Sequence, residues 1–164
     1  MLKLYAYRGK SFISKFIQFW TKGCYSHVSI EVGSIEQVPV TVEAWRGFVR
    51  LGDPRPVHRS NPPIDVYTIN LPILQQELML HFLLSQVNKR YDFLAMFDFM
   101  YSWRFMQKAG IRLLQHRDKW FCSELIAAAF NTATNTLVFS SNLVSPTELV
   151  EKLKQRGLVD VCNA

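Results

Sequence analysis

The chain has 164 residues, 49% of them hydrophobic and 20% charged, which excludes a disordered or low-complexity protein and predicts one domain over residues 1–164 with its own core. Three cysteines are too few, and odd in number, for a disulfide framework, so they favour a reducing compartment.

The charge is unevenly distributed along the chain. The formal net charge is +6, and the first 25 residues contain five basic and no acidic side chains. A basic end attracts anionic partners such as phospholipid or nucleic acid, but it does not distinguish them and makes neither obligatory. The same basic residues interrupt any signal-peptide core, and no run of about 18 apolar residues is present. We therefore expect a cytoplasmic protein without a membrane-spanning segment.

The first elements are a short strand and an amphipathic helix. Residues 2–7 are typical of a strand, and residues 11–20 carry apolar side chains at helical spacing. The helix is predicted to end at Lys22 and Gly23.

Two strands with polar faces follow. Alternating residues over 25–32 place His27 on the polar face of one strand, and Glu43 takes the same place in the run 40–45. A seven-residue connection, 33–39, would let the strands pair antiparallel, so Glu43 could orient the ring of His27.

The middle of the chain alternates between loop, strand and helix patterns. Residues 52–63 hold four of the seven prolines and predict a loop, residues 64–69 predict a strand, and a helix is expected from Pro72 to about Asn88. The aromatic segment 93–106 has a helical pattern that fits either a core helix or an apolar surface for an acyl chain or membrane.

Two helix starts are marked near the C-terminus. Cys122 lies where a polar, basic stretch gives way to helix-forming residues. Ser145 begins a capping box with proline at the first helical position, and Gly157 lies where that helix would end.

A cysteine at a helix start has the position of a nucleophile, because unpaired backbone N–H groups and the helix dipole stabilise a thiolate there. With His27 as base and Glu43 as orienting carboxylate, Cys122 would complete a triad for covalent acyl transfer. Tyr91 and Ser123 are further candidates for oxyanion or substrate contacts.

Five motifs resemble the circularly permuted NlpC-type cysteine hydrolases of the YiiX and YebB group, and they span roughly residues 24–150. They are Ser26-His27-Val28, Val42-Glu43-Ala44, Tyr91-Asp92, Phe121-Cys122-Ser123-Glu124-Leu125 and Ser145-Pro146-Thr147-Glu148-Leu149.

This resemblance implies an α+β, papain-like domain with an antiparallel sheet and helices packed on one side. It also implies amide hydrolysis, with Cys122 as nucleophile, His27 as general base and Glu43 as third polar residue. One departure is Ser29, which stands where similar proteins carry glycine and would narrow a substrate groove if that position lined one.

Other functions stay open at this point. The same fold could cleave a lipid ester or thioester, or transfer the acyl group. Alternatively, Cys122 could be a structural, buried thiol in a basic module that binds anionic lipid or nucleic acid. No metal-ligand spacing or Cys-x-x-Cys pair occurs, so we expect no metal and no organic cofactor.

Overall fold

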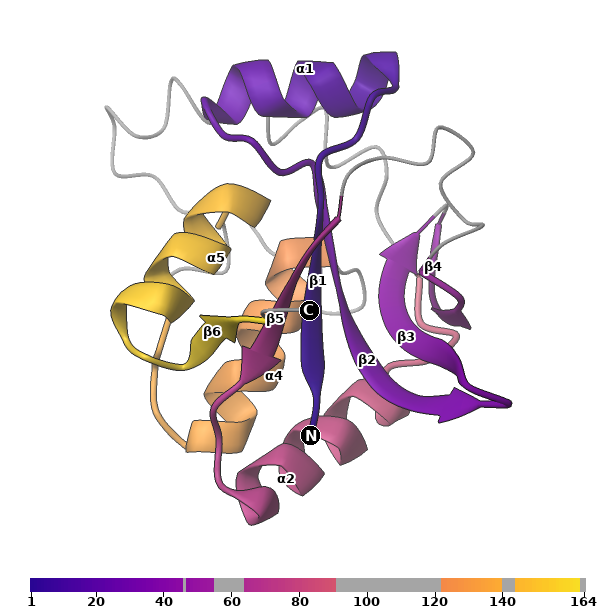
Figure 1. The fold of residues 1–164 in the computed structure, drawn as a ribbon, viewed down its shortest axis with the longest axis vertical. Helices are drawn as coiled ribbons and strands as arrows, with labels where there is room; N and C mark the ends of the chain where they lie inside the picture. The colour runs from indigo at the N-terminus through magenta and orange to yellow at the C-terminus, as the bar shows by residue number, and fades with distance from the viewer. Residues whose placement is uncertain (46, 55–63, 91–121, 140–143, 163–164) are drawn as a thin grey trace.

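The computed structural model describes residues 1–45, 47–54, 64–90, 122–139 and 144–162. Their centre is a six-stranded antiparallel sheet in the order β4-β3-β2-β1-β5-β6 (Figure 1). The strands are β1 (Lys3–Tyr7), β2 (His27–Ile35), β3 (Val38–Trp45), β4 (Phe48–Gly52), β5 (Ile64–Ile69) and β6 (Val159–Val161).

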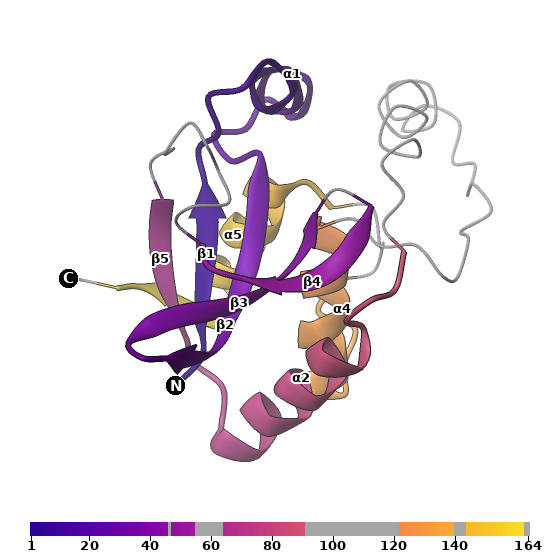
Figure 2. The same ribbon diagram turned by 90° about the vertical axis from the view of Figure 1, so that its right-hand side faces the viewer.

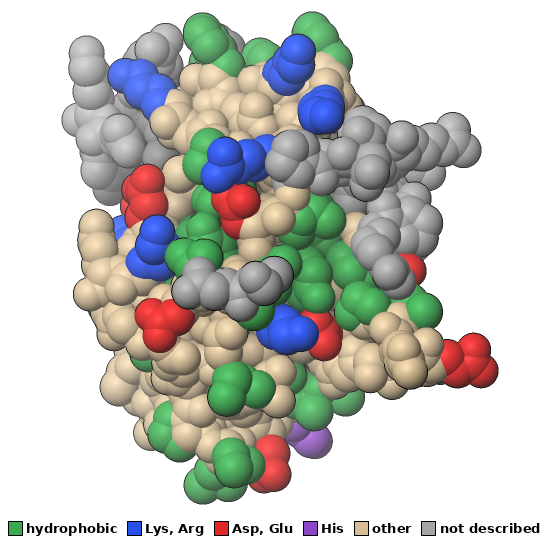
Figure 3. Space-filling model, in the orientation of Figure 1, with side chains coloured by type: hydrophobic (Ala, Val, Ile, Leu, Met, Phe, Trp, Pro, Cys, Tyr) green, Lys and Arg blue, Asp and Glu red, His purple; other side chains and the backbone are tan. Residues whose placement is uncertain are grey.

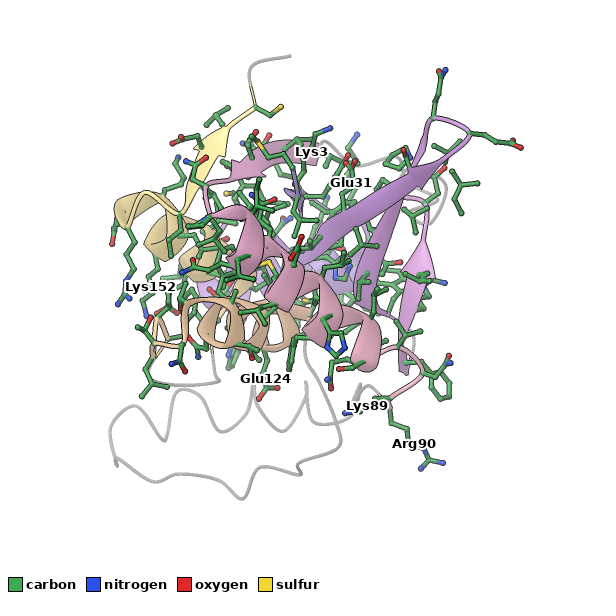
Figure 4. All side chains as sticks on the ribbon, turned by 90° about the horizontal axis from the view of Figure 1, so that it is seen from below. Lys3, Glu31, Lys89, Arg90, Glu124 and Lys152 are labelled. Atoms are coloured by element: carbon green, nitrogen blue, oxygen red, sulfur yellow. The ribbon has the colours of Figure 1, made fainter. Side chains whose placement is uncertain are left out.

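The described helices are α1 (Phe12–Thr21), α2 (Ile73–Ser85), α4 (Cys122–Thr134) and α5 (Pro146–Gln155). Helices α2, α4 and α5 lie on one side of the sheet, whereas α1 lies beyond the end of the sheet where β1 ends and β2 begins (Figures 1 and 2). Seen from below, α2 and α4 run side by side (Figure 4).

The predicted α+β class with an antiparallel sheet is therefore confirmed. So are the predicted first strand, the strand over 64–69 and the helix from Ser11, whose hydroxyl accepts a hydrogen bond from the Ser14 N–H at 3.1 Å. The capping box is present as expected: the Glu148 N–H donates to Ser145 Oγ at 3.2 Å. Gly157 follows the helix at φ +66°.

The predicted seven-residue connection between β2 and β3 is wrong. Both strands continue through it, and only Glu36 and Gln37 separate them. These residues adopt φ values of +49° and +67°, as a two-residue hairpin turn requires, but the sequence lacks the asparagine or glycine that usually marks such a turn.

Strands β4 and β6 were not expected, and α2 ends at Ser85 rather than near Asn88. The predictions for Tyr91-Asp92 and the aromatic segment 93–106 lie outside the described residues, as does most of the predicted loop 52–63.

The core lies between the sheet and helices α2, α4 and α5 (Figure 2). Helix α4 is buried along nine of its thirteen residues, because its small and apolar side chains allow it to fit between α2 and the sheet. Helix α4 also contacts β2 and β3, the strands that carry the polar candidates.

Polar contacts on the outer face of the sheet fix the register of β1 against β2. Lys3 lies opposite Glu31, and their side chains approach to 3.7 Å (Figure 4). The Tyr5 hydroxyl also donates to Glu31, at 2.6 Å. If the pairing of β1 with β2 shifted by one residue, every side chain of β2 would point to the other face of the sheet. This register therefore decides which face His27 occupies.

Candidate active site

His27 is the first residue of β2, and the chain before it is held from two sides. The Ser26 N–H donates to the Tyr7 carbonyl at 2.9 Å, and Ser26 Oγ accepts the Gly9 N–H at 3.1 Å. The Tyr25 N–H donates to Thr147 Oγ1 of α5 at 2.9 Å. These hydrogen bonds therefore fix the backbone that carries the imidazole of His27.

Glu43 of β3 lies beside the histidine. His27 Nε2 and Glu43 Oε2 are 2.9 Å apart, with the side chains only 6% and 1% exposed. The pairing of Ile30 with Val42 places both polar residues on the same face of adjacent strands. The sequence-based expectation that the structure would bring His27 and Glu43 together is met.

Arg50 of β4 completes the carboxylate's contacts and was not expected from the sequence. Its guanidinium donates from Nε and Nη2 to Glu43 Oε1, at 3.0 and 2.9 Å. Glu43 faces Arg50 across the ladder, because β3 and β4 pair antiparallel with these residues in register. A fork-shaped donor on one oxygen and an imidazole on the other hold the carboxylate in one orientation.

Cys122 is the first residue of α4 and is 8% exposed. Its charge and hydrogen bonding raise the pKa of His27, so the thiol lies near the imidazole. His27 Nε2 is the ring nitrogen that is bonded to Glu43. The structure thus brings a carboxylate, an imidazole and a thiol from β3, β2 and α4 into one series.

Aromatic rings enclose the imidazole. The ring centroid of Tyr7 lies 5.3 Å from that of His27, and Trp45 contacts it edge-on at 5.2 Å. Together with the strand backbone, these rings restrict the rotation of His27 about its side-chain bonds.

Burial and charge act in opposite directions on the pKa of His27. Burial lowers it, but the charge and hydrogen bond of Cys122, followed by those of Glu43, outweigh burial and raise it from 6.5 to about 9. At neutral pH this geometry favours the imidazolium form.

The pKa of Glu43 is held below its usual value. Burial favours its neutral form, yet hydrogen bonds and charge from His27 and Arg50 prevail. Glu43 therefore stays ionised at neutral pH, between two cationic groups.

Ser29 does not line an exposed groove. It is fully buried, and its hydroxyl lies 2.9 Å from the hydroxyl of Tyr7. Burial raises the pKa of Tyr7 and outweighs the opposite effect of the hydrogen bond with Ser29, so this phenol stays neutral. Ser29 thus contacts the ring beside His27, and the condition for a narrowed groove, that this position line one, is not met.

The remaining candidates differ in their surroundings. The Ser123 hydroxyl is buried and donates to the Val144 carbonyl at 2.5 Å, so it is engaged within the fold. Tyr91 lies outside the described residues. Within the part of the chain that is described, no group of three or more His, Cys, Asp or Glu side chains could hold a metal ion.

No protein-family model matches the chain, and no curated protein matches it either. A solved structure does: that of the metalloprotein yiiX from Escherichia coli O157:H7, which belongs to DUF1105. The chain shares its fold. The TM-score is 0.59 at 23% sequence identity, over 94% of this chain and 79% of yiiX. The β-sheet and helices that assemble the series of three side chains therefore belong to an arrangement found in yiiX.

Proposed function

We propose that the protein is a cysteine hydrolase that cleaves an amide bond through an acyl-enzyme. The observation that carries this proposal is the buried series of Glu43, His27 and Cys122, in which the thiol stands at the first residue of a helix. A structural cysteine needs neither an imidazole nor a carboxylate behind that imidazole.

The roles follow from the contacts. Glu43 orients the ring and stabilises the imidazolium through Nε2, and the ring takes the proton of Cys122. The thiolate attacks the carbonyl carbon, and backbone N–H groups at the start of α4 stabilise the oxyanion. The C–N bond then breaks as His27 returns the proton to the leaving amine. Water, deprotonated by the same ring, hydrolyses the thioester and restores the thiol.

The order of the elements supports a permuted papain-like arrangement. The base and carboxylate lie on strands that precede the nucleophile's helix, as the sequence motifs implied, and the fold similarity to yiiX covers 94% of the chain.

Intact-mass spectrometry with an activated ester tests the acyl-enzyme. The native chain is expected to gain one acyl group, mapped to Cys122 by peptide analysis, and Cys122→Ala is expected to lose it. His27→Ala should slow acylation by roughly 10²- to 10⁴-fold, since it removes the general base. Labelling of Cys122 that is equally fast without His27 would contradict the proposal.

Cys24 and Cys162 provide the matched controls. Both are free thiols more exposed than Cys122. Replacing either by alanine is expected to leave acylation of Cys122 unchanged, so that general thiol reactivity is separated from activation by His27.

Cleavage of a lipid ester or thioester is the second candidate, favoured by the apolar surface of α1, where Phe12 is 86% and Phe19 79% exposed. A panel of peptide amides, short-chain esters and long-chain thioesters distinguishes the two. Turnover that rises with acyl length would move the assignment from amide to lipid substrates.

A further inference from the structure

Helix α1 is amphipathic, and its apolar side is partly exposed: Phe12 and Phe19 are open to solvent, whereas Phe16 and Trp20 are half-buried. None of its ten residues is buried. The α1 face, by which we mean Phe12, Ile13, Phe16, Phe19 and Trp20, lies along one side of the helix, since these residues follow at spacings of one, three and four. In an ordinary surface helix this side would pack on the core.

The polar side of α1 contacts the segment that follows β1. Gln18 Nε2 donates to the Gly9 carbonyl at 3.1 Å. Ser14 packs so closely on Gly9 that a Cβ there would lie 2.2 Å from its hydroxyl oxygen. Ser14 and Gln18 are one turn apart, so the helix is attached to the end of β1 through a polar stripe.

Part of the exposed apolar area of the described residues lies on α1. Phe12 and Phe19 are 86% and 79% exposed, Ile13 is 42% exposed, and the rings of Phe16 and Trp20 stack at 5.8 Å beside them. Single exposed apolar residues are common, but a row of aromatic side chains on one helix marks an interaction surface. Figure 3 shows hydrophobic side chains next to basic ones at the end of the molecule formed by α1.

The charged side chains around α1 indicate which partner binds the α1 face. Lys10, Lys15 and Lys22 are exposed before, within and after the helix, and among the described residues they form no ion pair. The first 25 residues contain no acidic side chain. A partly exposed apolar stripe bordered by lysines is complementary to an anionic bilayer surface, where lipid headgroups bind the lysines and the acyl boundary takes the aromatic rings.

We propose that α1 docks the protein on membranes that contain anionic phospholipid. No helix in the described part of the chain is long and apolar enough to cross a bilayer. Docking is thus peripheral, with the α1 face entering about 5–10 Å into the headgroup region. His27 follows the helix by six residues and lies at the same end of the sheet, so a docked molecule holds its candidate site close to the lipid surface (Figure 1).

Vesicle co-sedimentation of the full chain tests the proposal, with phosphatidylcholine alone and phosphatidylcholine with phosphatidylserine. Binding is expected only with the anionic lipid and should weaken as salt rises. Phe12→Ser with Phe19→Ser should reduce partitioning at least tenfold, and each of Lys10→Gln and Lys15→Gln about fivefold.

The control variant combines Ile73→Ser with Leu137→Ser. These side chains are 76% and 78% exposed but lie outside α1, and their replacement should leave binding unchanged. Thermal unfolding checks that every variant is folded. Absent binding by the native chain, equal binding by the Phe12/Phe19 variant, or a dimer in sedimentation velocity that this variant abolishes would each overturn the proposal.

Docking does not depend on the proposed hydrolase activity. Cys122→Ala should bind vesicles like the native chain, because Cys122 lies outside the α1 face. Loss of acylation with retained docking, or the reverse, therefore identifies which of the two proposals fails.

Discussion

At the scale of single residues, Glu43 is the centre of the site. It is a carboxylate with 1% of its side chain exposed, and such a group is stable only when other groups compensate its charge. His27 and Arg50 provide that compensation on separate oxygens. The same contacts hold the imidazole for its proposed role, so stability and chemistry depend on one carboxylate.

Arg50→Met tests this dependence. The variant should lose about 1–3 kcal/mol of unfolding free energy, because one oxygen of a buried carboxylate loses its donors while the apolar stem is retained. Acylation of Cys122 should also slow, since the carboxylate is freer to turn away from His27. Urea unfolding and the acylation rate measure the two effects.

Arg156 offers the comparison, because its side chain is exposed and follows α5. Arg156→Met removes the same charge far from Glu43 in the fold and should leave stability and acylation within about 0.5 kcal/mol of the native chain. Equal effects of the two substitutions would show that net charge, and not the contact with Glu43, is responsible.

The sequence was sufficient to select Cys122, His27 and Glu43 as partners, because each marks a clear local pattern: a helix start or the polar face of an alternating strand. It was insufficient for Arg50. That residue acts through strand β4, which has only five residues, directly precedes the proline-rich stretch, and carries the arginine on an ordinary alternating pattern. Only the pairing of β4 with β3 places this arginine opposite Glu43.

At the scale of elements, local signals predicted the helices that have caps. Ser11 and Ser145 both accept the expected N-cap hydrogen bonds. The direction in which a helix faces was not predictable in the same way. The apolar spacing of residues 11–20 predicted an amphipathic helix, and with the contacts at Ser14 and Gln18 the side chains of Phe12 and Phe19 are exposed. Periodicity shows that a face exists but not what covers it.

Contacts between distant elements hold the start of β2. Thr147 of α5 accepts the Tyr25 N–H from 122 residues away and packs on Gly23. Thr147→Val keeps the shape of the side chain but leaves a buried N–H without its acceptor. We expect a loss of about 1–3 kcal/mol in unfolding free energy, measured in urea. We also expect slower acylation, because His27 follows Tyr25 by two residues.

Thr136→Val is the paired control. The Thr136 hydroxyl is exposed, and its bond to Thr134 Oγ1 lies in the turn after α4. Its removal should change the unfolding free energy by no more than about 0.5 kcal/mol. A Thr147 variant as stable as this control would mean that water replaces the lost acceptor and that α5 does not fix the start of β2.

At the scale of the whole molecule, the buried groups His27 and Glu43 make the unfolding free energy depend on pH, one in the alkaline range and the other in the acidic range. On the alkaline side, the pKa of His27 is about 9 in the folded chain against 6.5 when unperturbed. A raised pKa gives stability that is fully present below pH 6.5 and is lost as pH rises towards 9. On the acidic side, the lowered pKa of Glu43 gives stability that is present above its usual value of 4.5 and is lost as pH falls.

The unfolding free energy should therefore be highest between about pH 5 and 6.5 and should fall by on the order of 3 kcal/mol towards pH 9, since each tenfold change in proton affinity is worth about 1.4 kcal/mol. Urea unfolding at intervals from pH 4 to pH 9.5 measures this profile. His27→Gln lacks the titrating ring, so its alkaline arm should be flatter than that of the native chain. A native profile that stays level from pH 6.5 to pH 9 would show that His27 is neutral in the folded protein. The assignment of an imidazolium beside Cys122 would then be wrong.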